Sequence, residues 1–478
     1  MKTFWFVVGS QLLYGEVTLK HVEDDAIKIA RGLKTKYPVI YKGTVKSFDG
    51  AARIIKDANY DDSCLGIITF CHTFSPSKMW ANALNDLQKP WLHFHTQFHD
   101  EIPNDEIDMD YMNLHQSAHG DREHGFIGAR LQKPRKVIVG HWKNPNTSEA
   151  ISEWQEVVAA YHESRSLRVI RFGDNMREVA VTEGDKVEAQ LRFGWQVNTV
   201  PVGMLAETIK VVSKEELNAK MVEYRRNYQF NTDNYAAVEY QARAEIAIKK
   251  VLDYHQAKAF TNTFEDLYQI EQLPGLATQN LMKDGYGYGG EGDWKTAAIT
   301  RIFKSIGKLA TFMEDYTYDW KRGLILGAHM LEVCPSIAAE RPIIEVHHLG
   351  IGGKNPPARL VFEGKEGQAK AISLIDLGHR FRLIALDVEC VKPIKTMPNL
   401  PVARVMWKPK PNLETSAACW LIAGGAHHTT LVYDISLDFL RDFANLLGIE
   451  LIHIDERADP YLLEQAMKNN EIRYRFGG

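Results

Sequence analysis

The chain has 478 residues and a formal net charge of −4, with 45% hydrophobic and 25% charged residues. This composition is typical of a globular protein with enough apolar material for several cores, and it excludes the strongly basic surface of a nucleic-acid-binding protein. No apolar run approaches the roughly 18 residues of a membrane-spanning helix, so we expect no membrane partner.

The N-terminus and the cysteines indicate the compartment. The first apolar run, Phe4–Val8, is too short for the core of a signal peptide. The cysteines are odd in number, widely scattered and without a C-x-x-C pair, so neither a disulfide framework nor a zinc knuckle is indicated. We therefore expect reduced, buried thiols in a cytoplasmic protein. The five are Cys64, Cys71, Cys334, Cys390 and Cys419.

The first 170 residues alternate between strand-like and helix-like patterns. Short apolar runs are separated by segments whose apolar residues recur at helical spacing. Strands separated by helices predict parallel β-α-β units and an open, doubly wound sheet. The expected strands are Phe4–Val8, Val39–Val45, Leu65–Cys71, Trp91–Phe98 and Lys136–Trp142, and the expected helices are 19–33, Ala51–Ala58, Met79–Leu87 and Ser148–Ser164.

A second unit of the same kind is expected to begin at the strand Leu167–Phe172 and to continue through Gln190–Val197. Two helices, Lys214–Tyr224 and Ala236–His255, and the strand Ala257–Thr263 follow.

The C-terminal third changes character. Between Pro356 and Lys392 short alternating patterns are separated by turn residues with no helix between them, which favours an antiparallel barrel or sandwich. The helices Leu437–Leu447 and Pro460–Asn469 are expected to close the chain.

The stretch GYGYGGEGDW, residues 285–294, matches G-x-G-x-x-G and raises the question of a dinucleotide. A dinucleotide loop needs a strand before its glycines, whereas residues 274–283 have a helical pattern, and Glu291 and Asp293 would repel a pyrophosphate. We therefore expect no nucleotide. The glycines instead permit unusual turns that hold Glu291 at the start of a helix, with Asp293 as its cap.

Other ionisable residues lie in apolar or glycine-rich surroundings further along the chain. They are Glu314 in FMEDYTY, His329 in GAHMLE, and His427 and His428 in AGGAHHT. Buried ionisable groups are costly unless paired or bound to a cation, and two carboxylates with two imidazoles suit a borderline divalent metal. Spacing alone leaves separate structural roles for these residues open.

Lesser clusters have plainer interpretations. His93 and His95 lie on one face of a predicted strand, where hydrogen bonding is favoured over a metal pair. Glu332, three residues after His329, is expected to orient a histidine. The segment Arg122–Glu123–His124 is interpreted as a polar loop.

Several motifs together resemble the L-arabinose isomerase family and follow its order over nearly the whole chain. They include VVGSQLLYG (7–15), HTFSPSKMW (72–80), AHGDREHGFIGAR (118–130), RFGDNMREVAVTEGDKV (171–187), TNTFEDL (261–267), GYGYGGEGDWKTAA (285–298), FMEDYTY (312–318), GAHMLEVCPSIAAE (327–340), HLGIGGKNPPARL (348–360) and AGGAHHT (423–429).

The resemblance implies an α/β fold with two Rossmann-like (flavodoxin-like) parallel-sheet domains, residues 1–169 and 170–310, and a C-terminal antiparallel β-barrel domain with helices, residues 311–478. It also implies a homohexamer, with active sites at subunit interfaces that the N-terminal domain of a neighbour completes.

The resemblance further implies conversion of L-arabinose to L-ribulose, with D-galactose to D-tagatose as a side activity. Mn²⁺ is the implied metal, with Co²⁺ or Mg²⁺ as substitutes. The implied metal ligands are Glu291, Glu314, His329 and His428, and the implied substrate contacts are Gln11, Leu13, Met176, Phe264 and Ile351, together with His119 and Gln116 from across the interface.

Aldose–ketose isomerisation moves a proton from C2 to C1, so we expect Glu291 and Glu314 to form the proton-transfer pair as well as to bind the metal. Which carboxylate acts as the base, and whether a metal-assisted hydride shift replaces proton transfer, stays open at this point. His427 is expected either to contact substrate hydroxyls or to be structural. A sugar-binding protein, a nicotinamide-dependent oxidoreductase and an isomerase for another aldose such as L-fucose are the competing functions.

Overall fold

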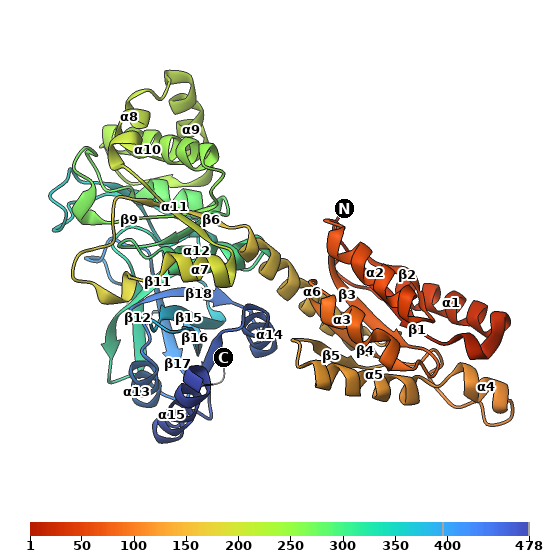
Figure 1. Ribbon diagram of the computed structural model, residues 1–478. Helices are drawn as coiled ribbons and strands as arrows, with labels where there is room; N and C mark the ends of the chain where they lie inside the picture. Colours follow the sequence, from red (N-terminus) through yellow and green to blue (C-terminus); the bar gives the residue numbers. More distant parts are fainter. Residues whose placement is uncertain (394–395, 477–478) are drawn as a thin grey trace. The chain divides into compact units, whose positions relative to one another are not determined.

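The computed structural model describes residues 1–393 and 396–476, and it divides into two compact units (Figure 1). Unit 1 comprises residues 1–162, and unit 2 begins at Glu163. All five cysteines are buried. In the described part of the chain, no helix combines the length and the apolar character needed to cross a membrane.

Unit 1 contains a five-stranded parallel sheet with the strand order β2-β1-β3-β4-β5, which confirms the expected parallel β-α-β arrangement. This is the order of the flavodoxin type, in which β1 and β3 lie next to each other at the centre. The strands are β1 (Thr3–Gly9), β2 (Val39–Val45), β3 (Cys64–Cys71), β4 (Trp91–His95) and β5 (Lys136–Val139), and the helices are α1 (Gly15–Gly32), α2 (Phe48–Tyr60), α3 (Ala81–Asp86), α4 (Met109–Leu114), α5 (Ser117–Leu131) and α6 (Pro145–Arg165).

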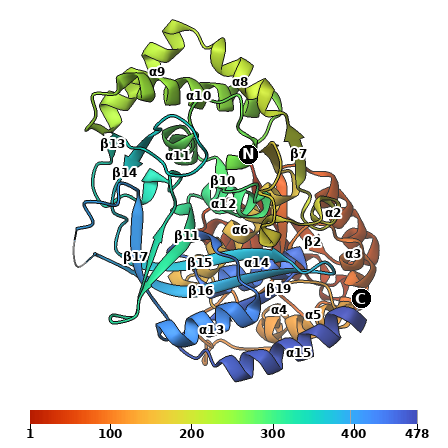
Figure 2. The ribbon, with the colours of Figure 1, turned by 90° about the vertical axis from the view of Figure 1, so that its left-hand side faces the viewer.

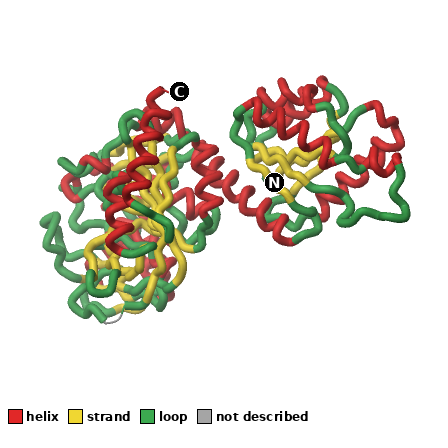
Figure 3. Tube along the Cα trace, turned by 90° about the horizontal axis from the view of Figure 1, so that it is seen from below, coloured by secondary structure: helices red, strands yellow, loops and turns green. Residues whose placement is uncertain are grey.

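Both faces of this sheet are covered, because successive side chains of a strand point to opposite faces. Trp5 and Val7 pack into the cluster that contains Ile55 of α2 and Leu84 of α3. The ring of Phe4 instead meets the ring of Trp154 on α6, with 5.2 Å between centroids. The strands of unit 1 therefore lie inside a shell of helices (Figure 3).

Two expectations for unit 1 need correction. Strands β4 and β5 end at His95 and Val139, several residues earlier than expected. The segment Arg122–Glu123–His124 is not a loop, because it lies within helix α5 and His124 is fully buried. The weak separation of polar and apolar residues around this helix explains why the pattern is hard to find in the sequence.

Unit 2 begins with a four-stranded parallel sheet of order β10-β9-β6-β7. The stretch Gln190–Val197 divides between the end of α7 and the start of β7. The elements are β6 (Arg168–Phe172), α7 (Lys186–Phe193), β7 (Gln196–Val200), α8 (Val202–Lys210), α9 (Lys214–Asn227), α10 (Tyr235–Tyr254), β9 (Ala259–Asn262), α11 (Gly275–Lys283), β10 (Gly287–Gly289) and α12 (Trp294–Ser305).

The rest of unit 2 is built on a mixed sheet. Its antiparallel pairs run β15-β18-β11-β12-β17-β16, β15 also pairs with β16, and β19 joins β16 in parallel. The antiparallel strands were expected, whereas closure into a barrel stays a prediction. The strands are β11 (Ala310–Asp319), β12 (Leu324–Ala328), β15 (Gly367–Asp376), β16 (Phe381–Val391), β17 (Arg404–Pro409), β18 (His428–Tyr433) and β19 (Glu450–Ile454).

Short strands and helices complete unit 2. A small sheet joins β14 (Ala358–Val361), β13 (Ile343–Val346) and β8 (Gln229–Phe230). The helices α13 (Leu413–Ala423) and α15 (Pro460–Phe476) lie side by side, as Figure 2 shows, and α14 (Leu437–Leu447) packs against β19.

Candidate functional site

Three of the expected site residues follow the carboxyl ends of three parallel strands in unit 2. Met176 comes after β6, Phe264 after β9 and Glu291 after β10. Parallel strands end at one edge of their sheet, which is where open α/β sheets bind ligands. The backbone joins two of these segments directly, because the Met176 amide donates to the Glu291 carbonyl oxygen at 2.9 Å.

The glycines of the 285–294 stretch serve close backbone packing. Gly287–Gly289 themselves form β10, so a strand does lead into the helix α12. A Cβ at Gly292 would lie 2.4 Å from the Cα of Asn175, and a Cβ at Gly290 would lie 2.9 Å from the ring of Phe312. Glu291 between them has a φ of 57°, a left-handed conformation that is strained for a residue with a side chain.

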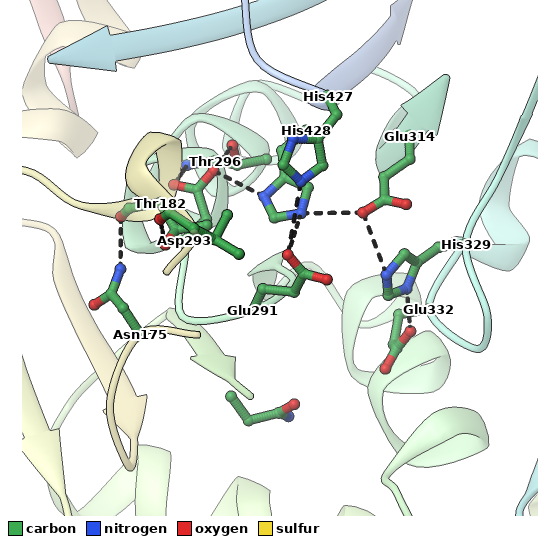
Figure 4. A network of polar contacts seen from close by, with 12 residues as sticks. Asn175, Thr182, Glu291, Asp293, Thr296, Glu314, His329, Glu332, His427 and His428 are labelled. Atoms are coloured by element: carbon green, nitrogen blue, oxygen red, sulfur yellow. Dashed lines mark hydrogen bonds and ion pairs between the residues drawn. The ribbon is translucent and has the colours of Figure 1, made fainter. Parts of the chain in front are cut away.

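Glu314 and His428 come from the mixed sheet, where they are paired across the antiparallel strands β11 and β18. This register brings Glu314 Oε1 to 3.0 Å from His428 Nε2. Glu291 Oε2 lies 3.5 Å from the same nitrogen (Figure 4). Two carboxylates from different sheets therefore meet at one imidazole.

Asp293 fixes the orientation of His428. Its carboxylate accepts from the backbone amides of Lys295 and Thr296, which caps α12 as the sequence predicts, and its Oδ2 lies 3.1 Å from His428 Nδ1. A carboxylate can only accept, so Nδ1 carries the hydrogen, and in the neutral ring Nε2 presents a lone pair. This Nε2 is buried and makes no hydrogen bond with the described residues.

His329 is oriented in the same way by Glu332. His329 follows β12, and its Nδ1 donates to Glu332 Oε2, as expected from the three-residue spacing. Its Nε2 therefore presents a lone pair, 3.5 Å from Glu314 Oε1. Carboxylates that hold the far nitrogen of an imidazole are characteristic partners of metal-binding histidines.

One compact group of ligand atoms differs by one residue from the set that the resemblance implies. Atoms of Glu291, Glu314, His427 and His428 all lie within 4.8 Å of one another. His427 thus takes the place expected for His329, with its Nε2 3.6 Å from Glu291 Oε2 and its side chain 46% exposed. His329 meets the group only through Glu314.

The charges of these groups are strongly coupled. Burial raises the pKa of Glu291, but the neighbouring imidazoles of His427 and His428 outweigh it and hold this pKa well below its usual value. The pKa of Glu314 is also lowered, since His329 and His428 outweigh the effect of burial. Conversely, burial lowers the pKa of His428, but Asp293, Glu291 and Glu314 raise it well above the ordinary value. The site therefore holds anionic carboxylates and attracts positive charge.

A cavity of about 530 Å³ opens beside Glu291. Met176, Phe264 and Ile351 line it, so three of the expected substrate contacts share one space with an expected catalytic carboxylate. The ring of Phe264 is stacked with that of His329, with 6.3 Å between centroids. The cavity is therefore bordered by apolar side chains and by Glu291, the member of the carboxylate–imidazole group that reaches it.

The remaining expected contacts lie in unit 1. Gln11 and Leu13 follow β1, and Leu13 is 83% exposed. Gln116, the N-cap of α5, contacts the Tyr14 hydroxyl at 3.5 Å, and the exposed His119 packs its ring on Phe74. These residues gather at the carboxyl edge of the unit 1 sheet.

Two further groups refine the sequence predictions. His93 and His95 both hydrogen-bond Asp121, at 3.0 and 2.8 Å, as the hydrogen-bonding interpretation predicts. Lys295 was not anticipated: its side chain is fully buried, lies 3.4 Å from Asp293 and donates to the carbonyls of Thr182 and Glu183. A lysine inside a helical pattern gives no sequence signal for such a role.

Fold and site define an α/β protein in which two carboxylates and oriented imidazoles converge beside a cavity at the carboxyl edge of a parallel sheet. Comparisons with known protein families identify the family to which this α/β protein belongs. The L-arabinose isomerase N-terminal domain matches residues 1–166, the central domain residues 168–309 and the C-terminal domain residues 309–450.

Full-length relatives agree with this assignment. An L-arabinose isomerase from Geobacillus stearothermophilus is 52% identical over 99% of this chain and 98% of its own length. L-arabinose isomerase 1 from Bacillus licheniformis is 52% identical over 99% and 98%, and a Thermotoga sp. L-arabinose isomerase is 51% identical over 98% and 97%. The chain belongs to the L-arabinose isomerase family and is an aldose–ketose isomerase.

Proposed function

We propose that this enzyme converts L-arabinose into L-ribulose with a divalent metal held by Glu291, Glu314, His329 and His428. The observation that carries the proposal is the shared orientation of the two imidazoles. Each donates its Nδ1 hydrogen to a buried carboxylate, so in the neutral rings each Nε2 lone pair faces Glu314. A lone pair facing an anionic carboxylate is repulsive unless positive charge lies between them.

The donor set fits a divalent cation. Two carboxylate oxygens and two imidazole nitrogens suit a borderline ion such as Mn²⁺ or Co²⁺, with Mg²⁺ as a harder substitute. The buried Nε2 of His428 has no hydrogen bond to give up, which favours its use as a ligand. A bound divalent ion supplies Lewis-acid polarisation of the substrate's oxygens.

Glu291 and Glu314 form the proton-transfer pair. Both carboxylates are anionic at neutral pH because their pKa values are lowered. One removes the proton from C2, and the carboxylic acid so formed returns it at C1 of the enediolate. The proton on the C2 hydroxyl must also reach the oxygen on C1, which is the task of the second carboxylate.

The substrate is held from two sides. Met176, Phe264 and Ile351 form the apolar walls of the cavity. We assign the hydrogen bond to a sugar hydroxyl to the exposed His427, whose Nε2 lies 3.6 Å from Glu291 Oε2. We propose that a neighbouring subunit supplies its unit 1 residues in a homohexamer. Those residues are Gln11, Leu13, Gln116 and His119.

The same proposal covers the finer expectations. D-galactose is a side substrate converted to D-tagatose, because it differs from L-arabinose only at the end of the sugar remote from C1 and C2. We also propose that the chain forms three domains, residues 1–169, 170–310 and 311–478, and that the protein is cytoplasmic.

The deciding experiment measures ketose formation from L-arabinose by the purified full-length chain. The protein is treated with EDTA, assayed, and assayed again after addition of Mn²⁺. Ribulose that forms only with the metal supports both the substrate and the site. A folded protein that forms no ribulose in either state, but isomerises L-fucose or another aldose, would move the assignment to that sugar.

A further inference from the structure

A second group of ligand-type side chains lies in unit 1, far along the chain from Glu291 and Glu314. Asp25 comes from α1, His72 directly follows β3 and His115 directly follows α4. Each offers one ligand atom, and the three atoms lie within 4.8 Å of one another. Asp25 is 7% exposed, His72 is 1% exposed and His115 is half-buried.

The hydrogen bonds of His72 fix where its lone pair points. Its Nδ1 lies 2.9 Å from the Leu114 carbonyl oxygen, which can only accept, so Nδ1 carries the hydrogen. In the neutral ring Nε2 then presents a lone pair, and this nitrogen lies 3.1 Å from Asp25 Oδ2. Two lone pairs cannot face each other stably at that distance, so a proton or a cation must lie between them.

His115 distinguishes these two alternatives. A single proton would join His72 to Asp25 and leave His115 without a role. Yet the Nδ1 of His115 is buried and has no hydrogen-bond partner among the described residues. Its ring lies 5.4 Å from that of His72, between centroids. A cation can engage all three residues at once, whereas a proton can engage only two.

The neighbouring charges leave room for a cation. Lys28 is the nearest cationic side chain to Asp25 in the described contacts, and it reaches the other carboxylate oxygen, Oδ1, at 3.4 Å. Its ammonium also lies over the Phe98 ring. Asp25 Oδ2, which faces His72, is therefore left for a further positive partner. The rings of His99 and Tyr111 pack against His115 on other sides.

The position in the fold is also that of a ligand site. In the strand order β2-β1-β3, the connection that leaves β1 and the connection that leaves β3 run over opposite faces of the sheet. Ligands bind at this point, beyond the carboxyl ends of the strands, and His72 is the first residue after β3. Ser10, the first residue after β1, hydrogen-bonds Thr73 across the same edge at 2.8 Å.

We propose that Asp25, His72 and His115 bind a divalent transition-metal ion of the Zn²⁺ type in unit 1. Two imidazoles and one carboxylate are a ligand set that such ions prefer. Bonds of about 2 Å in a tetrahedral site place ligand atoms roughly 3.3 Å apart, close to the separation of His72 Nε2 and Asp25 Oδ2. Because Gln116 directly follows His115, the ion would also anchor the start of α5.

The test isolates this site from the one in unit 2. The full-length chain carrying Glu291→Gln and Glu314→Gln is stripped with EDTA and titrated with Zn²⁺ against a chromophoric chelator. We expect about one tightly bound Zn²⁺ per chain. Adding His115→Gln should weaken that binding by at least about tenfold, because one of three protein ligands is lost.

The matched control is His99→Gln in the same background, since this histidine packs against His115 but is outside the ligand group. It should leave Zn²⁺ binding unchanged. No tight Zn²⁺ in the double variant, or equal affinity with and without His115, overturns the proposal. If the double variant does not fold, the otherwise unmodified chain decides: two equivalents falling to one with His115→Gln support the site, and an unchanged count rejects it.

Discussion

Glu314 and His428 lie directly opposite each other on the antiparallel strands β11 and β18, with 3.0 Å between Glu314 Oε1 and His428 Nε2. Residues so paired share one face of the sheet, and their separation is set by the strand register. The pair is therefore held rigidly, and both residues are buried. Variants of its members and of its neighbours test the proposed chemistry.

Replacing Glu314 by glutamine should abolish isomerisation. The amide keeps the shape of the side chain but loses the negative charge and the ability to accept a proton during the transfer between C2 and C1, so kcat should fall by at least about 10²-fold. The measurement is ketose formation at saturating Mn²⁺, with circular dichroism as the check of folding. Glu366→Gln, an exposed substitution of the same kind, should be neutral. Turnover at the unmodified rate in Glu314→Gln would refute the role.

Asp293→Asn should weaken metal binding while keeping the helix cap. Asparagine caps helices as well as aspartate does, but it is a poorer acceptor for His428 Nδ1, so the Mn²⁺ dissociation constant should rise about 10- to 100-fold. Titration of the EDTA-treated protein gives this constant. Asp185→Asn is the matched control, because Asp185 caps α7 and has no histidine partner among its described contacts. If both substitutions changed the Mn²⁺ dissociation constant equally, Asp293 would act only as a helix cap.

Isomerisation in D₂O separates the two routes for the hydrogen. A carboxylic acid formed from Glu291 or Glu314 exchanges its proton with solvent, so proton transfer should place deuterium at C1 of the ketose. A direct hydride shift carries the C2 hydrogen without exchange. Proton NMR of the product at early conversion measures the incorporation. Ketose without deuterium would remove both glutamates from the role of base.

Mixed assemblies test whether neighbouring subunits complete each site. Glu314→Gln and His119→Ala should each be inactive, since each lacks one part of the site. If the parts come from different subunits, co-refolded random mixtures should regain roughly a quarter of the normal activity, because that share of sites combines two intact parts. Mixtures that stay inactive while forming the normal oligomer would place both residues of a site in one chain.

Glu450→Gln should destabilise unit 2 by about 3 kcal/mol at pH 7, because it removes a buried charge shared by two arginines. Glu450 is 3% exposed and accepts from Arg380 and Arg382 at 2.8 Å each. Urea denaturation of both proteins measures the difference in the free energy of unfolding. Equal free energies of unfolding for the two proteins at pH 7 would contradict a stabilising role for the Glu450 charge.

The pH dependence of that difference has a definite sign. Burial raises the pKa of Glu450, but the hydrogen bonds from Arg382 and Arg380 outweigh it, so the folded pKa lies below the ordinary value of 4.5. A lowered carboxylate pKa contributes stability that is present above the unfolded pKa and is lost as the pH falls through the folded pKa. The difference should be constant above about pH 5.5 and should shrink below it. A difference that grows on acidification would contradict this origin.

The sequence by itself determined most of the fold and indicated which ionisable residues to propose for the site. The strand expected at Leu65–Cys71 begins only one residue earlier, at Cys64, and the helix Leu437–Leu447 has the predicted bounds, because continuous apolar runs and helical periodicity reflect local burial. Glu291, Glu314, His329 and the pair His427–His428 drew attention because ionisable residues in glycine-rich or apolar surroundings need a partner. The choice of Glu291, Glu314, His329 and His428 as the ligand set rested on the family resemblance and stays a proposal.

Only the tertiary structure decided how these groups meet. Glu291 and His428 are 137 positions apart, and their 3.5 Å approach depends on the edge of one sheet meeting a strand of another. The same holds for the nitrogen that each imidazole presents, which Asp293 and Glu332 select through hydrogen bonds. In unit 1, nothing local links Asp25, His72 and His115, because their convergence arises from strand order and not from spacing along the chain. Periodicity records which side of an element is buried, whereas the distance between two side chains depends on how all the elements between them pack.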